Sequence, residues 1–149
     1  MAVGMAFSAK QKKETHRVFC MMGDGETCEG EVWEAANTAG SYKLGNLVGI
    51  IDRNKQLMTS FDTEHMHLEP YADKWRAFNW NVVELDGHDM GQIVDTIDLA
   101  VRKKNGRPTV IVARTVKGKG VSFMENECGW HGRAPNDQEF AQSMAELGE

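Results

Sequence analysis

The sequence predicts an α/β fold, a parallel β-sheet with helices on both faces. Short apolar runs alternate with segments of helical periodicity, and these runs are continuously apolar instead of alternating with polar residues. Strands that are apolar throughout are typical of a parallel sheet buried between two layers of helices. With 149 residues, 41% of them hydrophobic, the chain has room for one core and not for two, so we expect residues 1–149 to form a single domain.

Each element in the first half has its own signal. Apolar residues recur at helical spacing in 2–13, and the run RVFCMM (17–22) predicts the first strand. Small residues along one side favour a helix at 31–43, and NLVGIID (46–52) predicts the second strand. The stretch 53–69 is mainly polar, which indicates a loop.

The second half continues the alternation, with a helix at 70–79, a strand at 80–86, an amphipathic helix at 90–105 and a strand at 107–115. We expect Gly106 to end the amphipathic helix, because glycine is favoured just beyond helix ends. After a polar loop at 116–135, Asn136 or Asp137 is the expected N-cap of a last helix. Right-handed connections would bring the ends of all the strands to one edge of the sheet, where such sheets bind ligands. The segments that follow the strands are 23–30, 53–60, 86–91 and 115–122.

Composition and charge exclude several kinds of partner. The net charge is −5 and no basic block is present, so we expect neither nucleic-acid nor membrane binding. No apolar stretch approaches the roughly 20 residues of a membrane span, and the N-terminal charges follow the apolar part, the reverse of a secretory signal. We therefore expect a cytoplasmic protein. Cys20, Cys28 and Cys128 lack CxxC spacing, which argues against a disulfide framework or a structural zinc site.

An acid between two glycines follows the first predicted strand, in the sequence GDG at residues 23–25. The glycines let a ligand approach the main chain, and the next helix would direct its free N–H groups at a phosphate. The dinucleotide fingerprint is absent, because Cys28 stands where the third glycine is required, and no GK[ST] of a Walker loop follows. Asp24 would repel a diphosphate unless a divalent cation lay between the two. The acid therefore predicts a metal site.

Further oxygen ligands for this cation are expected on the loop after the second strand. Mg²⁺ or Ca²⁺ takes only two or three ligands from the protein where phosphates supply much of the rest. Asn54 offers an amide oxygen, and Gln56 offers a main-chain carbonyl. A simpler interpretation is that the glycines form a tight turn, Asp24 caps the helix and Asn54 lies in an ordinary turn. The tripeptide alone does not distinguish the two.

Five separated motifs resemble one enzyme family. Asn54 follows Asp24 by 30 residues, a spacing that resembles the signature of thiamine-diphosphate enzymes. The stretches GDGETCEGEVWEAAN, NWNVVELDGHD, GRPTVIVARTVKGKG and GWHGRAP, together with the opening AVGMAFSAK, are similar to the diphosphate-binding domain of a transketolase. The resemblance runs from about residue 2 to 147 and implies the thiamine-diphosphate-binding fold. It also implies a transferase of carbohydrate metabolism, as in the pentose phosphate pathway, that moves a two-carbon ketol unit from a ketose (phosphate) to an aldose (phosphate).

The resemblance assigns roles to individual residues. Those matched to the thiamine diphosphate site are Gly23, Asp24, Gly25, Glu26, Asn54 and His131. Asp24, the side chain of Asn54 and the main-chain carbonyl of Gln56 match the ligands of Mg²⁺ or Ca²⁺. Glu29 matches an acid at the subunit interface near the cofactor, and His131 matches a histidine at the reacting centre, so these two are the implied catalytic residues.

Two departures from the family pattern stand out. Arg53 occupies a position where the family usually has an acid, and because a cation beside a metal site is unexpected, we expect Arg53 to point away. The segment that precedes AVGMA in a transketolase and the pyrimidine-binding domain are both outside this sequence. The resemblance thus implies a split or truncated N-terminal subunit, active with a partner chain that carries the pyrimidine-binding domain, in a dimer or heterotetramer.

Three alternatives stay open. The α subunit of a 2-oxoacid dehydrogenase shares GDG and a following EG…EA helix, although KLGNL, VKGKG and WHG favour a transketolase. A truncated domain with only a binding or assembly role is the second. The third places a transition metal on Asp62, Glu64, His65 and His67. Alternate residues of an extended strand face one way, so His65 and His67 could both bind the metal. We expect the helix residues Trp33, Trp75 and Ile97 in the core or an interface, with no role in a site.

Overall fold

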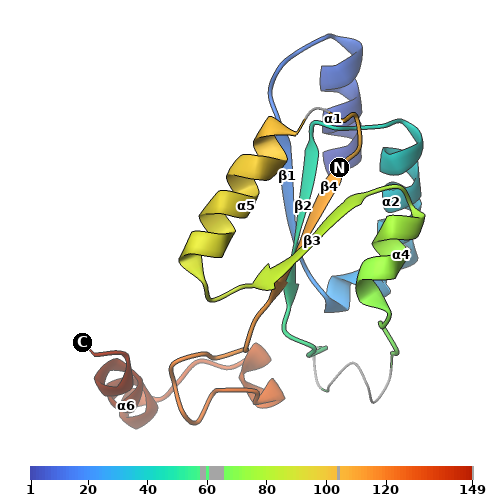
Figure 1. Cartoon of the computed structure of the whole chain (residues 1–149). Coiled ribbons are helices and arrows are strands. Elements are labelled where there is room, and N and C mark those ends of the chain that lie inside the picture. Colours follow the sequence, from blue (N-terminus) through green and yellow to red (C-terminus); the bar gives the residue numbers. More distant parts are fainter. Residues whose placement is uncertain (58–59, 61–65, 104, 149) are drawn as a thin grey trace.

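A computed structural model describes residues 1–57, 60, 66–103 and 105–148. Its strands form one parallel sheet in the order β1-β2-β4-β3, as Figure 1 shows. The strands are β1 (Val18–Gly23), β2 (Leu47–Arg53), β3 (Asn81–Asp86) and β4 (Thr109–Arg114). All lie within two residues of the predicted bounds, and the predicted α/β fold class with a parallel sheet is confirmed.

The helices in the described part of the chain are α1 (Ala2–Gln11), α2 (Gly30–Ser41), α4 (Tyr71–Ala77), α5 (Met90–Arg102) and α6 (Asp137–Leu147). Short 3₁₀ turns form η1 (Gly25–Cys28) and η2 (Cys128–His131). The expected cap of the last helix is confirmed, because Asn136 and Glu139 exchange side-chain and main-chain hydrogen bonds in a capping box. No helix among the described residues is long and apolar enough to cross a membrane.

The expected end of the amphipathic helix was wrong. Helix α5 ends at Arg102, and Lys103 already has extended backbone angles. Gly106 instead adopts a φ of 76° in the turn that leads into β4. Glycine is favoured at this positive φ because a Cβ atom would strain the backbone there. The glycine therefore serves the return of the chain to the sheet, and the helix ends before it.

Helices cover both faces of the sheet unequally. Helices α1, α2 and α4 lie on one face, and α5 alone lies on the other (Figure 1). Alternate residues of β4 divide between the two cores, with Val110 and Val112 on the first face and Ile111 packed in the α5 cluster. On the α5 side of the edge strand β1, Met21 is 72% exposed. The α5 face is thus open beside β1.

The larger core is built around aromatic residues. Trp75 is 1% exposed, and its ring centroid lies 5.2 Å from that of Trp33 and 5.0 Å from that of Trp80. Ile97 packs in the smaller cluster beneath α5. Trp33, Trp75 and Ile97 therefore belong to the core, as predicted.

Gly40 of α2 permits a close helix contact, and we expect Gly40→Ala to destabilise the fold by about 1–3 kcal/mol. A Cβ atom at this position would lie 1.8 Å from the carbonyl oxygen of Phe78, so the segment after α4 must move. The matched control is Gly4→Ala in α1, where a Cβ atom meets nothing within 4 Å. There the better helix propensity of alanine should raise stability by up to about 1 kcal/mol. Urea unfolding followed by circular dichroism measures both changes, and equal effects would contradict the packing described.

Candidate functional site

The carboxyl ends of β1 and β2 lie side by side, so the loops that follow them meet. Gly23 pairs with Asp52 in the parallel register, and the N–H of Asp24 donates to the carbonyl of Asp52 at 3.2 Å. Strand β4 lies on the other side of β2, with Arg53 opposite Arg114. The expected convergence of the strand ends therefore holds for these loops.

Asp24 is buried at the centre of this junction, with 1% of its surface exposed. Its Oδ2 accepts hydrogen bonds from Nη1 of Arg53 at 2.8 Å and from the N–H of Lys55 at 2.7 Å. Its Oδ1 has no hydrogen-bond partner, and the side chain makes no capping bond to η1. The simpler interpretation of Asp24 as a helix cap is therefore wrong, because its carboxylate points toward the loop after β2.

The expectation that Arg53 points away was wrong. Its side chain is 3% exposed and bridges two acids of the described part of the chain, with Nη1 on Asp24 and Nη2 on Glu69 at 3.0 Å. The guanidinium carbon also lies 4.9 Å from the centroid of the Tyr71 ring. The physical reason is that a carboxylate without a nearby positive charge is costly to bury. Arg53 supplies that charge to Asp24.

Burial raises the pKa of Asp24 above the ordinary value for an aspartate, although Arg53 and the N–H of Lys55 act in the opposite direction. The cation and the hydrogen bond thus do not fully offset the desolvation of this carboxylate. A divalent cation on Oδ1 would favour the charged form further. The pKa of Glu69 is lowered, first by the hydrogen bond that its carboxylate accepts from the N–H of Tyr71.

Asn54 and Gln56 form a tight turn next to Asp24. Oδ1 of Asn54 accepts the N–H of Gln56 at 2.9 Å, which leaves this carbonyl oxygen a second lone pair. A Cβ atom on Gly25 would lie 3.9 Å from the carbonyl oxygen of Gln56, so the GDG loop and the main chain of Gln56 are in contact. A buried carboxylate oxygen without a partner, an amide oxygen and a main-chain carbonyl are the ligands that a hard divalent cation takes. The residues present therefore fit such an ion.

Among the described residues, the hydrogen bonds and ion pairs of the Asp24 side chain involve Arg53 and Lys55, and the other candidate residues have different partners. Glu26 turns back, and its carboxylate accepts the N–H of Gly23 at 2.6 Å. Glu29 is exposed just before α2 and makes no capping bond. His131 is exposed in η2, with Nδ1 3.4 Å from Nζ of Lys117.

The alternative transition-metal site falls mostly on residues outside the described part of the chain. Asp62, Glu64 and His65 are among them, and His67 is exposed. Among the described residues, no group of three or more histidines, cysteines and acids is placed to hold a metal ion.

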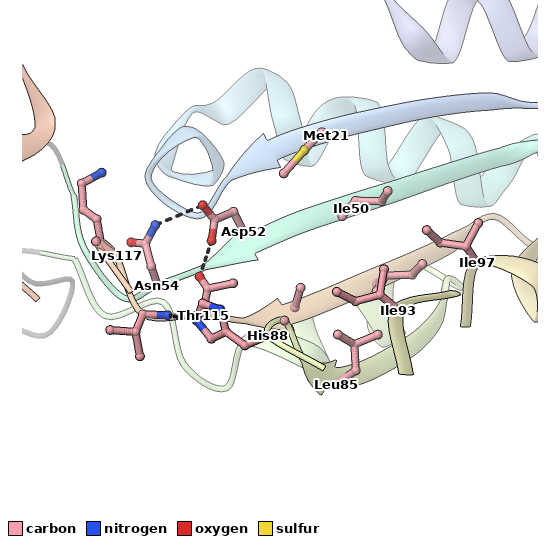
Figure 2. Close-up of a pocket in the computed structure, with 15 residues that line it drawn as sticks. Met21, Ile50, Asp52, Asn54, Leu85, His88, Ile93, Ile97, Thr115 and Lys117 are labelled. Carbon is pink, nitrogen blue, oxygen red and sulfur yellow. Dashed lines mark hydrogen bonds between the residues drawn. The ribbon is translucent and has the colours of Figure 1, made fainter. Parts of the chain in front are cut away.

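A cavity of about 500 Å³ opens at the carboxyl ends of the strands, between the sheet and α5. Figure 2 shows its two parts, an apolar wall that includes Met21, Ile93 and Ile97 and a polar end that includes Asn54 and Lys117. The apolar wall follows from the open α5 face beside β1. The polar end places a lysine near the amide of the candidate metal site.

Sequence reasoning assigned no role to several polar residues of this cavity. Asp52 accepts a hydrogen bond from the hydroxyl of Thr115, and Nε2 of His88 accepts the N–H of Val116 at 2.8 Å (Figure 2). These bonds connect the loop after β4 to the end of β2 and to the loop after β3. The sequence did contain a signal for two polar residues of the cavity, because His88 lies in the motif DGHD and Lys117 lies in the motif VKGKG.

The sheet and its junction define a class of protein, an α/β domain with polar loops gathered at the carboxyl ends of parallel strands, the edge at which such sheets bind ligands. Residues 4–149 match the family described as "Transketolase, thiamine diphosphate binding domain". The chain belongs to this family, and the resemblance inferred from its motifs is confirmed, in preference to a 2-oxoacid dehydrogenase subunit.

Named relatives include separate subunits. The chain is 40% identical over 149 residues to an apulose-4-phosphate transketolase subunit of Phocaeicola vulgatus, in a match that covers 100% of this chain and 53% of the relative. It is 38% identical over 146 residues to the 6-deoxy-6-sulfo-D-fructose transketolase subunit SqwG of Clostridium sp., covering 98% and 53%. The chain thus spans about half the length of these curated relatives.

Solved structures agree with the family. The transketolase from Campylobacter jejuni superposes with a TM-score of 0.91 at 27% identity, covering 99% of this chain and 24% of that one. The transketolase from Leishmania mexicana superposes with a TM-score of 0.87 at 25% identity, covering 99% and 23%. The fold described above is therefore that of a transketolase domain.

Proposed function

We propose that this chain is the diphosphate-binding subunit of a transketolase that uses thiamine diphosphate and Mg²⁺ or Ca²⁺. The observation that carries the proposal is the buried Asp24, whose free Oδ1 lies at the junction with the Asn54–Gln56 turn. Membership of a thiamine-diphosphate-binding family and relatives named as transketolase subunits support it. The partner would be a chain with the pyrimidine-binding domain, in a dimer or heterotetramer.

The chain's own residues would hold the cofactor by its diphosphate. Asp24, Asn54 and the carbonyl of Gln56 would bind the metal ion, and the diphosphate would complete its coordination. Gly23 and Gly25 add no side chain beside the main chain that the phosphates would approach. When bound, the cofactor supplies the carbon nucleophile that cleaves and reforms the bond next to the sugar carbonyl.

Lys117 and His131, at or near the cavity, would stabilise negative charge on the phosphates or on the substrate. Lys117 lines the cavity, and its Nζ lies 3.4 Å from Nδ1 of His131. Lys117 would bind a phosphate, and His131 would donate to the substrate oxygen on which charge develops. Glu26 would hold the GDG loop through the N–H of Gly23. Glu29 is exposed, which leaves it available to a partner chain near the cofactor.

The proposal predicts two-carbon transfer only when the chain is combined with its partner. The test mixes the purified chain with a chain that carries the pyrimidine-binding domain and offers ketose phosphates and 6-sulfonated ketoses with aldose phosphate acceptors. We expect ketol transfer that requires thiamine diphosphate and a divalent cation. Release of CO₂ from 2-oxoacids without ketol transfer would contradict it. Failure to bind the cofactor even with the partner present would favour a role in assembly alone.

A further inference from the structure

Arg53 holds Asp24 in one orientation. One oxygen of the carboxylate, Oδ2, accepts from two donors, Nη1 of Arg53 at 2.8 Å and the N–H of Lys55 at 2.7 Å. The other oxygen, Oδ1, is buried and has no hydrogen-bond partner. The two oxygens of this acid are therefore not equivalent, and only Oδ1 is open to a further ligand.

Arg53 is itself fixed by neighbours outside the GDG loop. Its Nη2 donates to Oε1 of Glu69 at 3.0 Å, and its guanidinium lies over the ring of Tyr71. Oε2 of Glu69 in turn accepts the N–H of Tyr71 at 2.8 Å. A planar guanidinium can make two such contacts in fixed directions, whereas a lysine ammonium offers a single point charge. The start of α4 thus fixes the side chain that orients Asp24.

We propose that Arg53 is a positioning residue, which occupies Oδ2 of Asp24 so that Oδ1 is presented to the metal ion as a single-oxygen ligand. The inference rests on the metal site proposed above and deepens it. The cation that would orient Asp24 is in turn paired with Glu69. Groups that orient metal ligands typically contribute 10–100-fold to metal affinity.

The test is the affinity for Mn²⁺ as a paramagnetic substitute for Mg²⁺, measured by electron paramagnetic resonance titration with thiamine diphosphate and the partner chain present. We expect Arg53→Met to weaken Mn²⁺ binding by roughly 10–100-fold, and Arg53→Lys to restore part of the loss. The matched control is Arg114→Met, because Arg114 lies opposite Arg53 on β4 but pairs with Glu84 near the surface. Its Mn²⁺ affinity should equal that of the unchanged protein.

The outcomes separate this inference from the proposed function. If the unchanged protein binds no Mn²⁺ with the cofactor, the proposed metal site itself fails. If the unchanged protein binds Mn²⁺ and folded Arg53→Met binds it equally well, the positioning role is overturned and the metal site stands. If Arg53→Met does not fold by circular dichroism, Glu69→Gln decides the question. That variant keeps an acceptor for the N–H of Tyr71 and loses the charge that pairs with Nη2 of Arg53, so weaker Mn²⁺ binding supports the role and unchanged binding overturns it.

Discussion

Asp24→Asn is expected to weaken metal-dependent binding of thiamine diphosphate by more than roughly 100-fold, which exceeds the typical cost of losing a group that only orients a metal ligand. The substitution keeps the shape of the side chain but removes the negative charge that a divalent cation requires at Oδ1. Asn54→Ala should have an effect of the same kind, because it removes the amide oxygen of the adjacent turn. Isothermal titration calorimetry with the cofactor, in Mg²⁺ and with the partner chain present, measures both losses.

A matched control uses an acid outside the site. Asp98 lies on α5 in an exposed pair with Arg102, so Asp98→Asn changes the same charge without touching the junction. Its cofactor affinity should be unchanged, and all three variants should keep the far-ultraviolet circular dichroism of the unchanged protein. Unchanged cofactor affinity in both Asp24→Asn and Asn54→Ala would remove the proposed metal site.

Trp75→Ala is expected to lower the free energy of unfolding by about 3–5 kcal/mol, the usual range for truncating a buried aromatic side chain. The indole is buried between Trp33 and Trp80 and joins α4 to the larger core. Because domains of this size are stable by only about 5–15 kcal/mol, the variant should lose a large part of its free energy of unfolding. Urea unfolding monitored by circular dichroism measures the change.

The control for this prediction is an exposed aromatic residue. Phe140 on α6 is 55% exposed, and Phe140→Ala should change the free energy of unfolding by less than about 0.5 kcal/mol. A loss for Trp75→Ala as small as that of the control would show that the three tryptophans do not form the described core.

The sequence was sufficient for most of the fold because its strands are continuous apolar runs bounded by clear breaks. The two loops that carry Asp24 and Asn54 were expected to meet because the strands before them follow each other in the sequence. The structure places these two strands side by side and parallel. The end of α5 was less predictable, since Gly106 has its own role in the turn before β4. Local sequence patterns thus predicted which segments form helices and strands more accurately than they predicted the residue at which α5 ends.

The rest of the site depended on contacts that one sequence does not contain. The orientation of Arg53 follows from the burial of Asp24 and from Glu69, which lies 16 residues further along the chain. The bond between Asp52 and Thr115 requires β4 to lie beside β2, and this strand order cannot be read from periodicity. Both features arise from which strands and loops are neighbours in space.

We propose that a metal ion held by Asp24 and Asn54 binds the diphosphate of the cofactor. The most direct measurement is electron–nuclear double resonance on Mn²⁺ bound with thiamine diphosphate to the chain and its partner. We predict phosphorus-31 couplings from the diphosphate to Mn²⁺, and their loss in Asp24→Asn. The same couplings with undiminished intensity in Asp24→Asn, or Mn²⁺ bound to the protein without any phosphorus coupling, would contradict the claim.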